Sequence, residues 1–579
     1  MPEAHGGDRI AEVLGRWEIG SLFTLCGGHI SPLLVGAQAR GLRIVDGRDE
    51  RSMVFAADAA ARLSGRPGVV AVTAGPGVTN AVTALKNAQM AQSPIVVFGG
   101  ATATMLEGRG ALQDIDQAAL VRSTVKRVFR CRRVPELGPT TERALEEASS
   151  GVPGPVFVEV PVDLLYPEAT VRSWYLEQTG AARPTSLATR ALRVYLEGYL
   201  WRQFHQPPLP AWARSRADTL PEPTDDEVRR VADRLASAHR PVLVIGSQTL
   251  VGERDPASLA AAVASLGVPT WLGGMARGLL GRSSELQFRH RRSRALKEAD
   301  LVLVAGFPLD FRMGYGRGFG RATLAAVNRS RRELELNRKP DIAVHASPAT
   351  FLRALAGVAS ASGARTAWFE RLRALEAERD AEIAAQAAPA EEKVNPIQFL
   401  LRLEEALQDD AILVADGGDF VGSAAYTLRP RGPLAWLDPG AFGTLGVGGG
   451  FAAGAAAVHP DRPVWILYGD GSCAYSIAEF DTFVRQGMAP IAIVGNDASW
   501  QQIARDQVTI LGDDVGTRLR ATAYHRVAEG YGGVGLEITD AAAIDRTLEE
   551  AKHHAATGRP VLINVHLAPT DFRKGSISI

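Results

Sequence analysis

The sequence predicts an α/β protein built from three domains, each a parallel sheet flanked by helices. Short apolar runs of strand length alternate with helical patterns along most of the 579 residues. This alternation is typical of parallel sheets covered on both faces. A chain of this length is also too long for a single hydrophobic core, which favours about three or four domains.

Changes in composition divide the chain into three domains and two connecting segments. The proline-rich region 182–222 is interpreted as a linker or insertion, and the charged helical region 366–394 as a linker helix. The predicted domains are therefore 1–181, 223–365 and 395–579.

Strands are predicted where apolar runs are bounded by Gly, Pro, Asn or Asp. In the first domain these runs lie at 21–26, 42–47, 68–75, 94–100 and 154–161. In the central domain they lie at 241–247, 268–274, 299–306 and 324–330. In the third domain they lie at 411–420, 463–471, 490–496 and 560–567.

Composition argues against several functional classes. Lys+Arg and Asp+Glu are equal at 64 each, and this balance argues against a nucleic-acid binder. Cys26, Cys131 and Cys473 are too few and too scattered for a disulfide framework or a metal knuckle, and they fit a reducing cytosol. The N-terminus has no apolar run of signal length, and no uninterrupted apolar stretch of about twenty residues occurs. We expect a soluble, cytoplasmic protein without nucleic-acid or membrane partners.

The most informative motif is Gly469-Asp470-Gly471, which ends one predicted strand, together with Asn496, which ends a later one. Because the carboxyl ends of adjacent parallel strands meet at one edge of a sheet, an Asp and an Asn placed there can reach the same cation. Oxygen ligands suit Mg²⁺, which usually also holds substrate phosphates. The glycines allow backbone to approach a diphosphate closely.

This pattern resembles the signature of thiamine diphosphate enzymes, a GDG followed by a segment that ends in Asn. The resemblance implies the thiamine diphosphate-binding fold with pyrimidine, central and diphosphate domains in that order. It also implies Mg²⁺ bound by Asp470, Asn496 and the backbone carbonyl of Ala498. Around the diphosphate it places Gly418, Asp419, Phe420, Gly471 and Ser472.

A glycine-rich segment, GAFGTLGVGGG, resembles the cofactor clamp of the same enzymes. The resemblance implies that the carbonyl of Gly443 accepts a hydrogen bond from the cofactor's aminopyrimidine, and that Leu445 wedges between the two rings. The plainer interpretation is a tight strand-to-helix crossing.

In the first domain, VDGRDERSMVFAADAAARLSG matches the segment that supplies the family's essential acid, with Asp49 where His is commoner. The resemblance implies that Glu50 shares a proton with N1' of the pyrimidine on a partner subunit. A homodimer would then be the minimum assembly, and homotetramers are usual in the family that the sequence resembles. A Glu at a helix start can also be an ordinary cap.

Two more residues match positions that handle substrate oxygens in related C–C lyases. His29 follows the first strand, and Gln113 lies in the loop GRGALQDIDQ. His29 could move a hydroxyl proton because its unperturbed pKa lies near neutrality. The plainer interpretation is a His bonded to backbone at a helix start.

Several stretches, among them GGHISPLL, DGGDFVG and WLDPGAFGTLGVG, resemble the acetolactate-synthase-like branch of 2-hydroxyacyl-CoA lyases. The implied reaction cleaves 2-hydroxyacyl-CoA to an aldehyde and formyl-CoA, and its reverse is an acyloin condensation. One alternative is an acetolactate synthase-like 2-keto-acid carboligase or decarboxylase, although GNDASWQQI replaces the NNxxxGM run usual there. Another is a non-catalytic thiamine diphosphate-binding subunit.

A CoA thioester requires a place for its nucleotide, and the central domain is the candidate for CoA or ADP, less so for FAD. The candidate phosphate partners there are Arg277, Arg282, Arg312 and Arg317. Each could instead be a solvated surface arginine. Arg573 and Lys574 of the tail could face CoA, and Trp500 could shape the substrate pocket or lie in the core.

Overall fold

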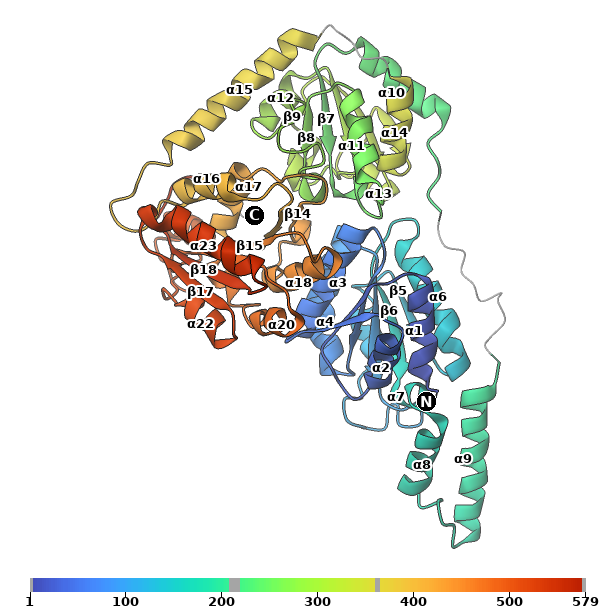
Figure 1. The fold of residues 1–579 in the computed structure, drawn as a ribbon. Helices are drawn as coiled ribbons and strands as arrows, with labels where there is room; N and C mark the ends of the chain where they lie inside the picture. The colour runs from blue at the N-terminus through green and yellow to red at the C-terminus, as the bar shows by residue number, and fades with distance from the viewer. Residues whose placement is uncertain (1–3, 208–218, 360–364, 575–579) are drawn as a thin grey trace. The chain divides into compact units, whose positions relative to one another are not determined.

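The structure, a computed structural model, describes residues 4–207, 219–359 and 365–574 (Figure 1). The chain forms two compact units, one of residues 1–61 and 66–218 and the other of residues 62–65 and 219–579. The described residues contain three six-stranded sheets, and the strands within each sheet pair in parallel. The predicted α/β class is therefore confirmed. Each of the predicted ranges 1–181, 223–365 and 395–579 encloses one sheet.

The first unit contains one sheet, with strand order β2-β1-β3-β4-β6-β5. Its strands are β1 (Ser21–Thr24), β2 (Arg43–Asp46), β3 (Gly68–Val72), β4 (Ile95–Ala101), β5 (Arg127–Arg130) and β6 (Val156–Pro161). Its helices are α1 (Gly6–Arg16), α2 (Ser31–Ala39), α3 (Glu50–Ser64), α4 (Pro76–Ala91), α5 (Gln117–Val121), α6 (Leu137–Ser149) and α7 (Val162–Leu165). Strands β3 and β6 are fully buried, as expected of central strands covered by helices on both faces.

A helical hairpin follows this sheet. It consists of α8 (Glu168–Gln178) and α9 (Leu187–His205), which lie side by side in Figure 1. The carboxylate of the fully buried Asp163 accepts hydrogen bonds from Tyr175 of α8 and Gln203 of α9, at 2.7 and 2.6 Å. These buried hydrogen bonds link both helices to Asp163, which directly follows β6 in the chain.

The second unit contains two sheets. The central one has strand order β12-β11-β10-β7-β8-β9. Its strands are β7 (Pro241–Ile245), β8 (Thr270–Leu272), β9 (Gln287–Phe288), β10 (Leu301–Ala305), β11 (Thr323–Asn328) and β12 (Ile342–His345). Its helices are α10 (Asp225–Ser237), α11 (Pro256–Ser265), α12 (Arg292–Glu298), α13 (Arg331–Leu334), α14 (Pro348–Val358) and α15 (Thr366–Ala385). Helix α15, which the sequence suggests as a linker, buries Trp368, Leu372 and Leu375 in the central core.

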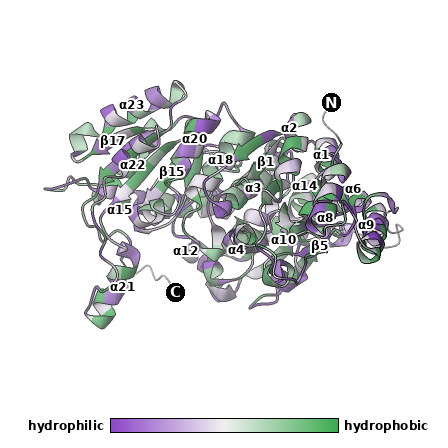
Figure 2. Cartoon of the chain, turned by 90° about the horizontal axis from the view of Figure 1, so that it is seen from below, coloured by the Kyte–Doolittle hydropathy of each residue, from purple (hydrophilic) through white to green (hydrophobic). Residues whose placement is uncertain are grey.

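The third sheet has strand order β14-β13-β15-β16-β18-β17. Its strands are β13 (Ile412–Ala415), β14 (Trp436–Leu437), β15 (Val464–Gly469), β16 (Ile491–Asn496), β17 (Val534–Ile538) and β18 (Val561–His566). Its helices are α16 (Pro396–Ala406), α17 (Asp419–Thr427), α18 (Gly448–Val458), α19 (Asp470–Cys473), α20 (Glu479–Gln486), α21 (Gln501–Leu511), α22 (Tyr524–Gly530) and α23 (Ile544–Ala556). Figure 2 shows β15 largely in green, whereas α20 carries purple residues.

All thirteen runs predicted as strands contain a strand, and the structure adds five that the sequence did not reveal: β5, β9, β12, β14 and β17. Each of the five lies at an edge of its sheet. All five are short, and all except the two-residue β14 are partly exposed, so they lack the long continuous apolar run of a central strand. Across the described residues, no helix is both long enough and apolar enough to cross a membrane.

Candidate functional site

In the first unit, the three predicted catalytic residues gather around one turn, Thr73–Gly77, between β3 and α4. Gly75 takes a φ of 61°, a conformation that favours glycine. A Cβ at Gly77 would lie 3.3 Å from Oε1 of Glu50, and one at Gly75 would lie 2.9 Å from Cβ of Gln113. The two glycines therefore let the turn approach Glu50 and Gln113 closely.

Glu50 is the first residue of α3 and is only 7% exposed. Its Oε2 accepts a hydrogen bond from Nδ2 of Asn80 in α4 at 3.1 Å. The carboxyl group is thus buried and oriented by an amide, which suits a group that must exchange a proton with a ligand.

His29 is half-buried in the loop between β1 and α2, where its Nδ1 lies 3.3 Å from Oγ1 of Thr73. Burial lowers the pKa of His29, so the ring is held in its neutral form. The close approach of Gly100, where a Cβ would lie 2.6 Å from Cβ of His29, packs the ring's base against β4.

Gln113 has a φ of 64°, which is uncommon for a residue with a side chain. Such backbone strain costs on the order of 1–3 kcal/mol and clusters at ligand-binding sites. Gln113 lines a cavity of about 270 Å³ together with Arg130 and Glu159. Burial raises the pKa of the Glu159 carboxyl group, which lies 3.2 Å from Nε of Arg130.

Gln117 supports the turn at Gly75 through hydrogen bonds, and this role was not predicted from the sequence. It is 2% exposed, its Oε1 accepts from the amide of Gly75 at 3.3 Å, and its Nε2 donates to the carbonyl of Gly100 at 2.8 Å. Nothing in the local sequence distinguishes it from an ordinary helix glutamine, because its partners are brought near only by the sheet.

In the second unit, the metal candidates lie at the carboxyl ends of β15 and β16. Gly469 pairs with Gly495 across these strands, so Asp470 and Asn496 leave the sheet side by side. Both side chains are buried, at 3% and 2% exposure. Asp470 accepts hydrogen bonds from the amides of Gly471 at 2.7 Å and Ser499 at 3.2 Å.

Asn496 supplies an oxygen that fits a metal. Its Nδ2 donates to the carbonyl of Thr522 at 3.0 Å and to Oδ1 of Asn564 at 3.1 Å. This fixes the amide orientation and leaves Oδ1 buried with no hydrogen-bond partner among the described residues. A buried acceptor of this kind is costly unless it binds a ligand. The third candidate, Ala498, has a φ of 58°, and its carbonyl accepts a hydrogen bond from Leu519 at 2.8 Å.

The electrostatics of this edge also suit a cation. Burial raises the pKa of Asp470 to about 6. Burial, followed by the charge of Asp470, raises the pKa of Asp497 to about 7. A divalent cation bound here would offset the cost of keeping both carboxylates ionised.

The predicted diphosphate residues surround one backbone crossing. Gly418 has a φ of 109° and precedes α17, and the amide of Gly469 donates to the carbonyl of Gly417 at 3.1 Å. Ser472 places its hydroxyl 3.1 Å from the carbonyls of both Gly417 and Gly469. Turns that precede helices present backbone amides to anions, so this crossing can bind phosphate oxygens.

The remaining predicted side chains of this group point elsewhere. The carboxylate of Asp419 pairs with Nη2 of Arg505 of α21 at 2.7 Å, and both groups are largely buried. Phe420 lies in the core, with its ring 2.4 Å from where a Cβ of Gly495 would be.

Trp500 packs on Gly471: a Cβ at Gly471 would lie 2.4 Å from the indole ring. Both sequence interpretations of Trp500, a pocket wall and a packed side chain, are compatible with this position. The contact explains why the second glycine of the GDG motif must be glycine.

The clamp segment meets the diphosphate turn through Leu445 and Gly417, where a Cβ at Gly417 would lie 2.3 Å from Cδ2 of Leu445. Gly443 is exposed and has a φ of 65°. Sequence reasoning missed Asp416, which is 3% exposed and accepts from the amides of Gly446 at 2.9 Å and Gly448 at 2.6 Å. An acid that ends a strand just before a glycine turn was the available signal.

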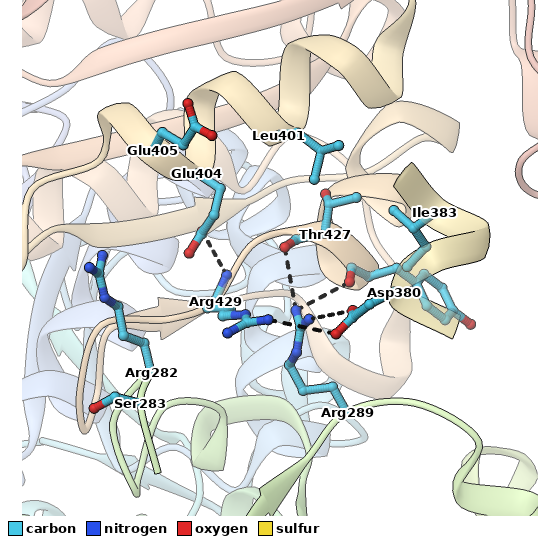
Figure 3. A pocket seen from close by; sticks show the side chains of 11 residues that line it. Arg282, Ser283, Arg289, Asp380, Ile383, Leu401, Glu404, Glu405, Thr427 and Arg429 are labelled. Carbon is cyan, nitrogen blue, oxygen red and sulfur yellow. Dashed lines mark hydrogen bonds and ion pairs between the residues drawn. The ribbon is translucent and has the colours of Figure 1, made fainter. Parts of the chain in front are cut away.

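A cavity of about 1200 Å³ adjoins this crossing, within the second unit. It reaches Gly417 and Gly418 at one end and is rich in arginine: Arg277, Arg289, Arg291, Arg292, Arg294, Arg312, Arg379 and Arg573 line it. Two predicted phosphate partners, Arg277 and Arg312, are among these, whereas Arg282 lines a neighbouring cavity of about 650 Å³ (Figure 3). Arg317 lines neither cavity.

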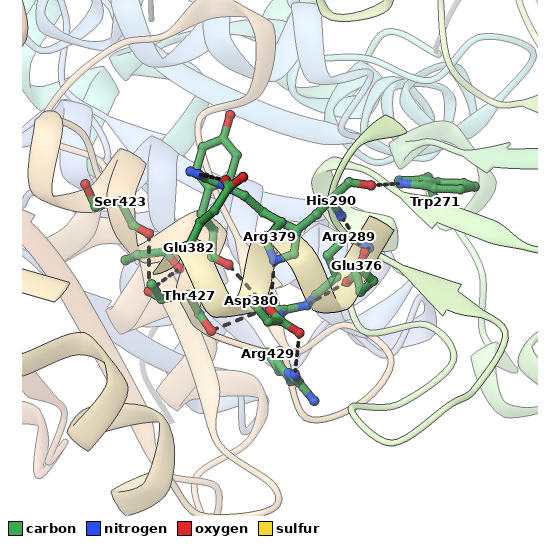
Figure 4. Close-up of polar contacts among 12 residues, drawn as sticks. Trp271, Arg289, His290, Glu376, Arg379, Asp380, Glu382, Ser423, Thr427 and Arg429 are labelled. Atoms are coloured by element: carbon green, nitrogen blue, oxygen red, sulfur yellow. Dashed lines mark hydrogen bonds and ion pairs between the residues drawn. The ribbon is translucent and has the colours of Figure 1, made fainter. Parts of the chain in front are cut away.

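Helix α17 connects the diphosphate turn with these cavities. It begins after Gly418, and at its other end Nη1 of Arg289 donates to the carbonyls of Tyr426 and Thr427, both at 3.3 Å. Figure 4 shows Arg289 held in turn by Glu376 and Asp380 of α15. A cation at a helix C-terminus is favourable, so α15 and the central domain stabilise the position of α17.

Fold and site together define an enzyme class. Residues 4–120 match the N-terminal thiamine pyrophosphate binding domain of thiamine pyrophosphate enzymes, residues 228–355 the central domain, and residues 416–565 the C-terminal thiamine pyrophosphate binding domain. The chain belongs to the thiamine pyrophosphate enzyme family.

Several proteins are similar to this chain over nearly its whole length. The chain is 47% identical to 2-hydroxyacyl-CoA lyase 2 of Danio rerio, over 99% of this chain and 93% of that protein. It is also 47% identical to 2-hydroxyacyl-CoA lyase 2 of Homo sapiens, over 99% and 92%. To an acetolactate synthase large subunit of Mycobacterium tuberculosis it is 32% identical, over 98% and 96%.

Proposed function

We propose that this protein is a thiamine diphosphate-dependent lyase that cleaves 2-hydroxyacyl-CoA to an aldehyde and formyl-CoA, and that also catalyses the reverse condensation. The observation that carries the proposal is the arginine-rich cavity that opens onto the diphosphate turn at Gly417 and Gly418. A CoA thioester carries phosphate groups of its own, and a cavity of this kind beside the cofactor would suit them. The whole-length likeness to 2-hydroxyacyl-CoA lyases supports the same substrate class.

The residues present fit the cofactor and its metal. Asp470, Asn496 and the carbonyl of Ala498 would hold Mg²⁺. The observation in favour is the buried Oδ1 of Asn496, which has no hydrogen-bond partner within the part of the chain that the structure describes. Gly418, Gly471 and Ser472 would hold the diphosphate, and Gly443 with Leu445 would hold the rings. When bound, thiamine diphosphate supplies the carbon nucleophile and accepts the electron pair of the broken C–C bond.

Side chains of the protein would position the cofactor and the substrate and would exchange protons with them. Glu50, buried and oriented by Asn80, would share a proton with the pyrimidine nitrogen N1'. His29, kept neutral by burial, would accept the hydroxyl proton of the substrate as the aldehyde forms. Gln113 would donate a hydrogen bond to the thioester oxygen. As the family resemblance implies, Glu50 would act on the cofactor of a partner subunit, which requires at least a homodimer and fits a homotetramer.

The large cavity would hold the nucleotide of CoA, or ADP, through its guanidinium groups. Burial, and after it the positive charge of Arg277, lowers the pKa of Arg292, and Arg277 and Arg312 line the same cavity. Arg573 of the tail lies over the ring of Tyr426 at 5.6 Å and lines the same cavity, whereas Lys574 does not. Bidentate arginine contacts are well suited to phosphate.

The test is a direct comparison of substrates. With thiamine diphosphate and Mg²⁺ present, a 2-hydroxyacyl-CoA should give formyl-CoA and aldehyde in equal amounts. The 32% likeness to an acetolactate synthase favours a second candidate, a 2-keto-acid carboligase. Formation of acetolactate from pyruvate at a comparable rate would favour that candidate and contradict the lyase proposal.

A further inference from the structure

Gln117, the first residue of α5, joins two backbone segments beyond the point where their strands pair. The pairing of β3 with β4 ends at Val72 and Gly99. Beyond that point the amide of Gly75 donates to Oε1 of Gln117 at 3.3 Å, and Nε2 of Gln117 donates to the carbonyl of Gly100 at 2.8 Å. A side-chain amide carries a donor and an acceptor as a peptide group does, so Gln117 bridges the two segments in its place.

Each of the two bridged glycines packs against one of the predicted catalytic residues. A Cβ at Gly75 would lie 2.9 Å from Cβ of Gln113, and a Cβ at Gly100 would lie 2.6 Å from Cβ of His29. Gln113 and His29 are the two side chains proposed to contact the oxygens of the substrate. The bridge made by Gln117 therefore fixes the position of one of these side chains relative to the other.

Gln117 is also the buried anchor of the loop that carries Gln113. Gln113 lies four residues before it in the sequence and has a φ of 64°. A backbone conformation of this kind persists only where the surrounding structure holds it. Much of the loop is open to solvent, since Leu112 is 83% and Ile115 is 47% exposed, whereas Gln117 is only 2% exposed. Loss of the Gln117 amide would therefore loosen this loop from the sheet.

The orientation of the Gln117 amide is fixed by a third partner, Glu159 of β6. The carboxyl group of Glu159 is hydrogen-bonded to Gln117, is 6% exposed and lies 3.2 Å from Nε of Arg130. An acid that accepts from the amide nitrogen leaves the amide oxygen facing Gly75. Because a buried polar group is costly without its partners, each of these bonds favours a single placement of the side chain.

Glu50, the predicted acid of the cofactor site, is held by other contacts. It is the first residue of α3, and its Oε2 accepts a hydrogen bond from Asn80 of α4 at 3.1 Å. Its Oε1 would lie 3.3 Å from a Cβ at Gly77, which also belongs to α4. Neither contact involves the Gln117 amide, so Glu50 should stay in place when that amide is removed.

We propose that Gln117 is a positioning residue that sets Gln113 and His29 for the substrate and does not act in the activation of the cofactor. The role given to Gln117 rests on the proposed function, because it takes those two side chains as the groups that contact the substrate. A displacement of about 1 Å at a positioned group can cost roughly 10²-fold in rate. Removal of the amide should therefore slow C–C cleavage, whereas exchange of the cofactor's C2 proton, which depends on Glu50, should continue.

The test uses Gln117→Met in the full-length protein, because methionine keeps the length of glutamine and removes its polar group. With thiamine diphosphate and Mg²⁺ bound, kcat for a 2-hydroxyacyl-CoA should fall about 10²-fold, with KM little changed. The rate of hydrogen–deuterium exchange at C2 of the bound cofactor, measured by acid quench and proton NMR, should stay at the wild-type value. If the methionine variant does not fold, Gln117→Asn replaces it, since a side chain one carbon shorter does not span both backbone groups.

The matched control is Gln203→Met, at a second buried glutamine of the same unit. Gln203 is 3% exposed, and its Nε2 donates to Asp163 at 2.6 Å, away from the predicted catalytic residues. This variant should lower the melting temperature as Gln117→Met does, because each loses a buried hydrogen bond, but it should keep the wild-type kcat. The comparison separates a positioning role from a loss of stability.

A second measurement needs neither cofactor nor substrate. Diethyl pyrocarbonate, followed by peptide mass spectrometry, should modify His29 faster in Gln117→Met than in the wild type, because Gly100 would no longer be held against the base of that side chain. His459, a half-buried histidine of the other unit, should react equally in both proteins. If the wild type makes no formyl-CoA, the proposed function fails, whereas the reactivity of His29 still decides whether Gln117 positions it.

Four results would overturn the proposal. The first is a wild-type kcat in Gln117→Met, and the second is a rate of C2 exchange that falls by the same factor as kcat. The third is an equal loss of kcat in Gln203→Met, which would make the effect one of stability. The fourth is an unchanged rate of modification of His29.

Discussion

Leu445 lies on Gly417 so closely that a Cβ at position 417 would come within 2.3 Å of Leu445 Cδ2. The contact joins the clamp segment to the diphosphate turn, so the two parts of the candidate cofactor site cannot move separately. Asp416 reinforces it by accepting hydrogen bonds from the amides of Gly446 and Gly448.

Gly417→Ala should therefore displace Leu445 and weaken cofactor binding. Overpacking of a fitted site typically costs about 1–3 kcal/mol, which corresponds to a roughly tenfold or larger rise in the dissociation constant of thiamine diphosphate. Calorimetric titration with the cofactor measures it. Gly432→Ala, where a Cβ would meet nothing within 4 Å, is the control. Equal affinities for the two variants would contradict the role given to Leu445.

Glu50→Gln should retain Mg²⁺ and thiamine diphosphate but lose turnover. The amide keeps the shape and can still bond to Asn80, whereas it cannot share a proton with the pyrimidine ring. A loss of about 10²–10⁴-fold in kcat is expected, with the cofactor dissociation constant changed little. Steady-state kinetics and cofactor titration test this pair of expectations. Wild-type kcat in this variant would rule out Glu50 as the essential acid.

Asn496→Leu should weaken Mg²⁺ binding at least about tenfold, because it removes the only side-chain oxygen that β16 contributes to the proposed site. Asn564→Leu is the matched control, since it breaks the same amide network but leaves Oδ1 of Asn496 in place. Mg²⁺ titration in the presence of thiamine diphosphate compares the two. If both variants bind Mg²⁺ as the wild type does, the metal lies elsewhere.

The pH dependence should reflect the neutral state of His29. Burial lowers the pKa of His29 below its ordinary 6.5, so the base remains available below that pH and kcat/KM should decline only at a lower pH. The unfolded chain binds this proton first as pH falls, so the free energy of unfolding decreases from about pH 6.5 down to the lower pKa of folded His29. In His29→Gln the low-pH decline of the residual activity should disappear. A decline that begins above 6.5, or that persists in the variant, would exclude His29 as the base.

Arg292→Ala should raise KM for the acyl-CoA about tenfold with little effect on kcat, because a charge-assisted hydrogen bond contributes roughly 1.5 kcal/mol. Arg317→Ala, an exposed arginine outside both cavities, should leave KM unchanged. The affinity for thiamine diphosphate should stay the same in both. Identical KM values would place the nucleotide of CoA away from this cavity.

Some strands could be predicted from the sequence, and others could not. Central strands such as β3 and β16 are predicted because they are buried on both faces and therefore apolar throughout. Edge strands such as β17, which is buried only at its two ends, carry too weak a pattern. The same limit applies to Gln117 and Asp416, whose importance lies in backbone partners that are distant along the chain.

By itself the sequence determined the fold class, the order of the domains and the residue types of a thiamine diphosphate site, because these depend on local apolar patterns and on motifs with fixed spacing. Only the tertiary structure decided which predicted groups meet a ligand. In the tertiary structure Phe420 lies in the core and Asp419 is paired with Arg505. Oδ1 of Asn496 has no hydrogen-bond partner among the described residues, and Arg317 does not line the arginine-rich cavity. Side-chain direction and burial are set by contacts between distant segments, which a linear pattern does not contain.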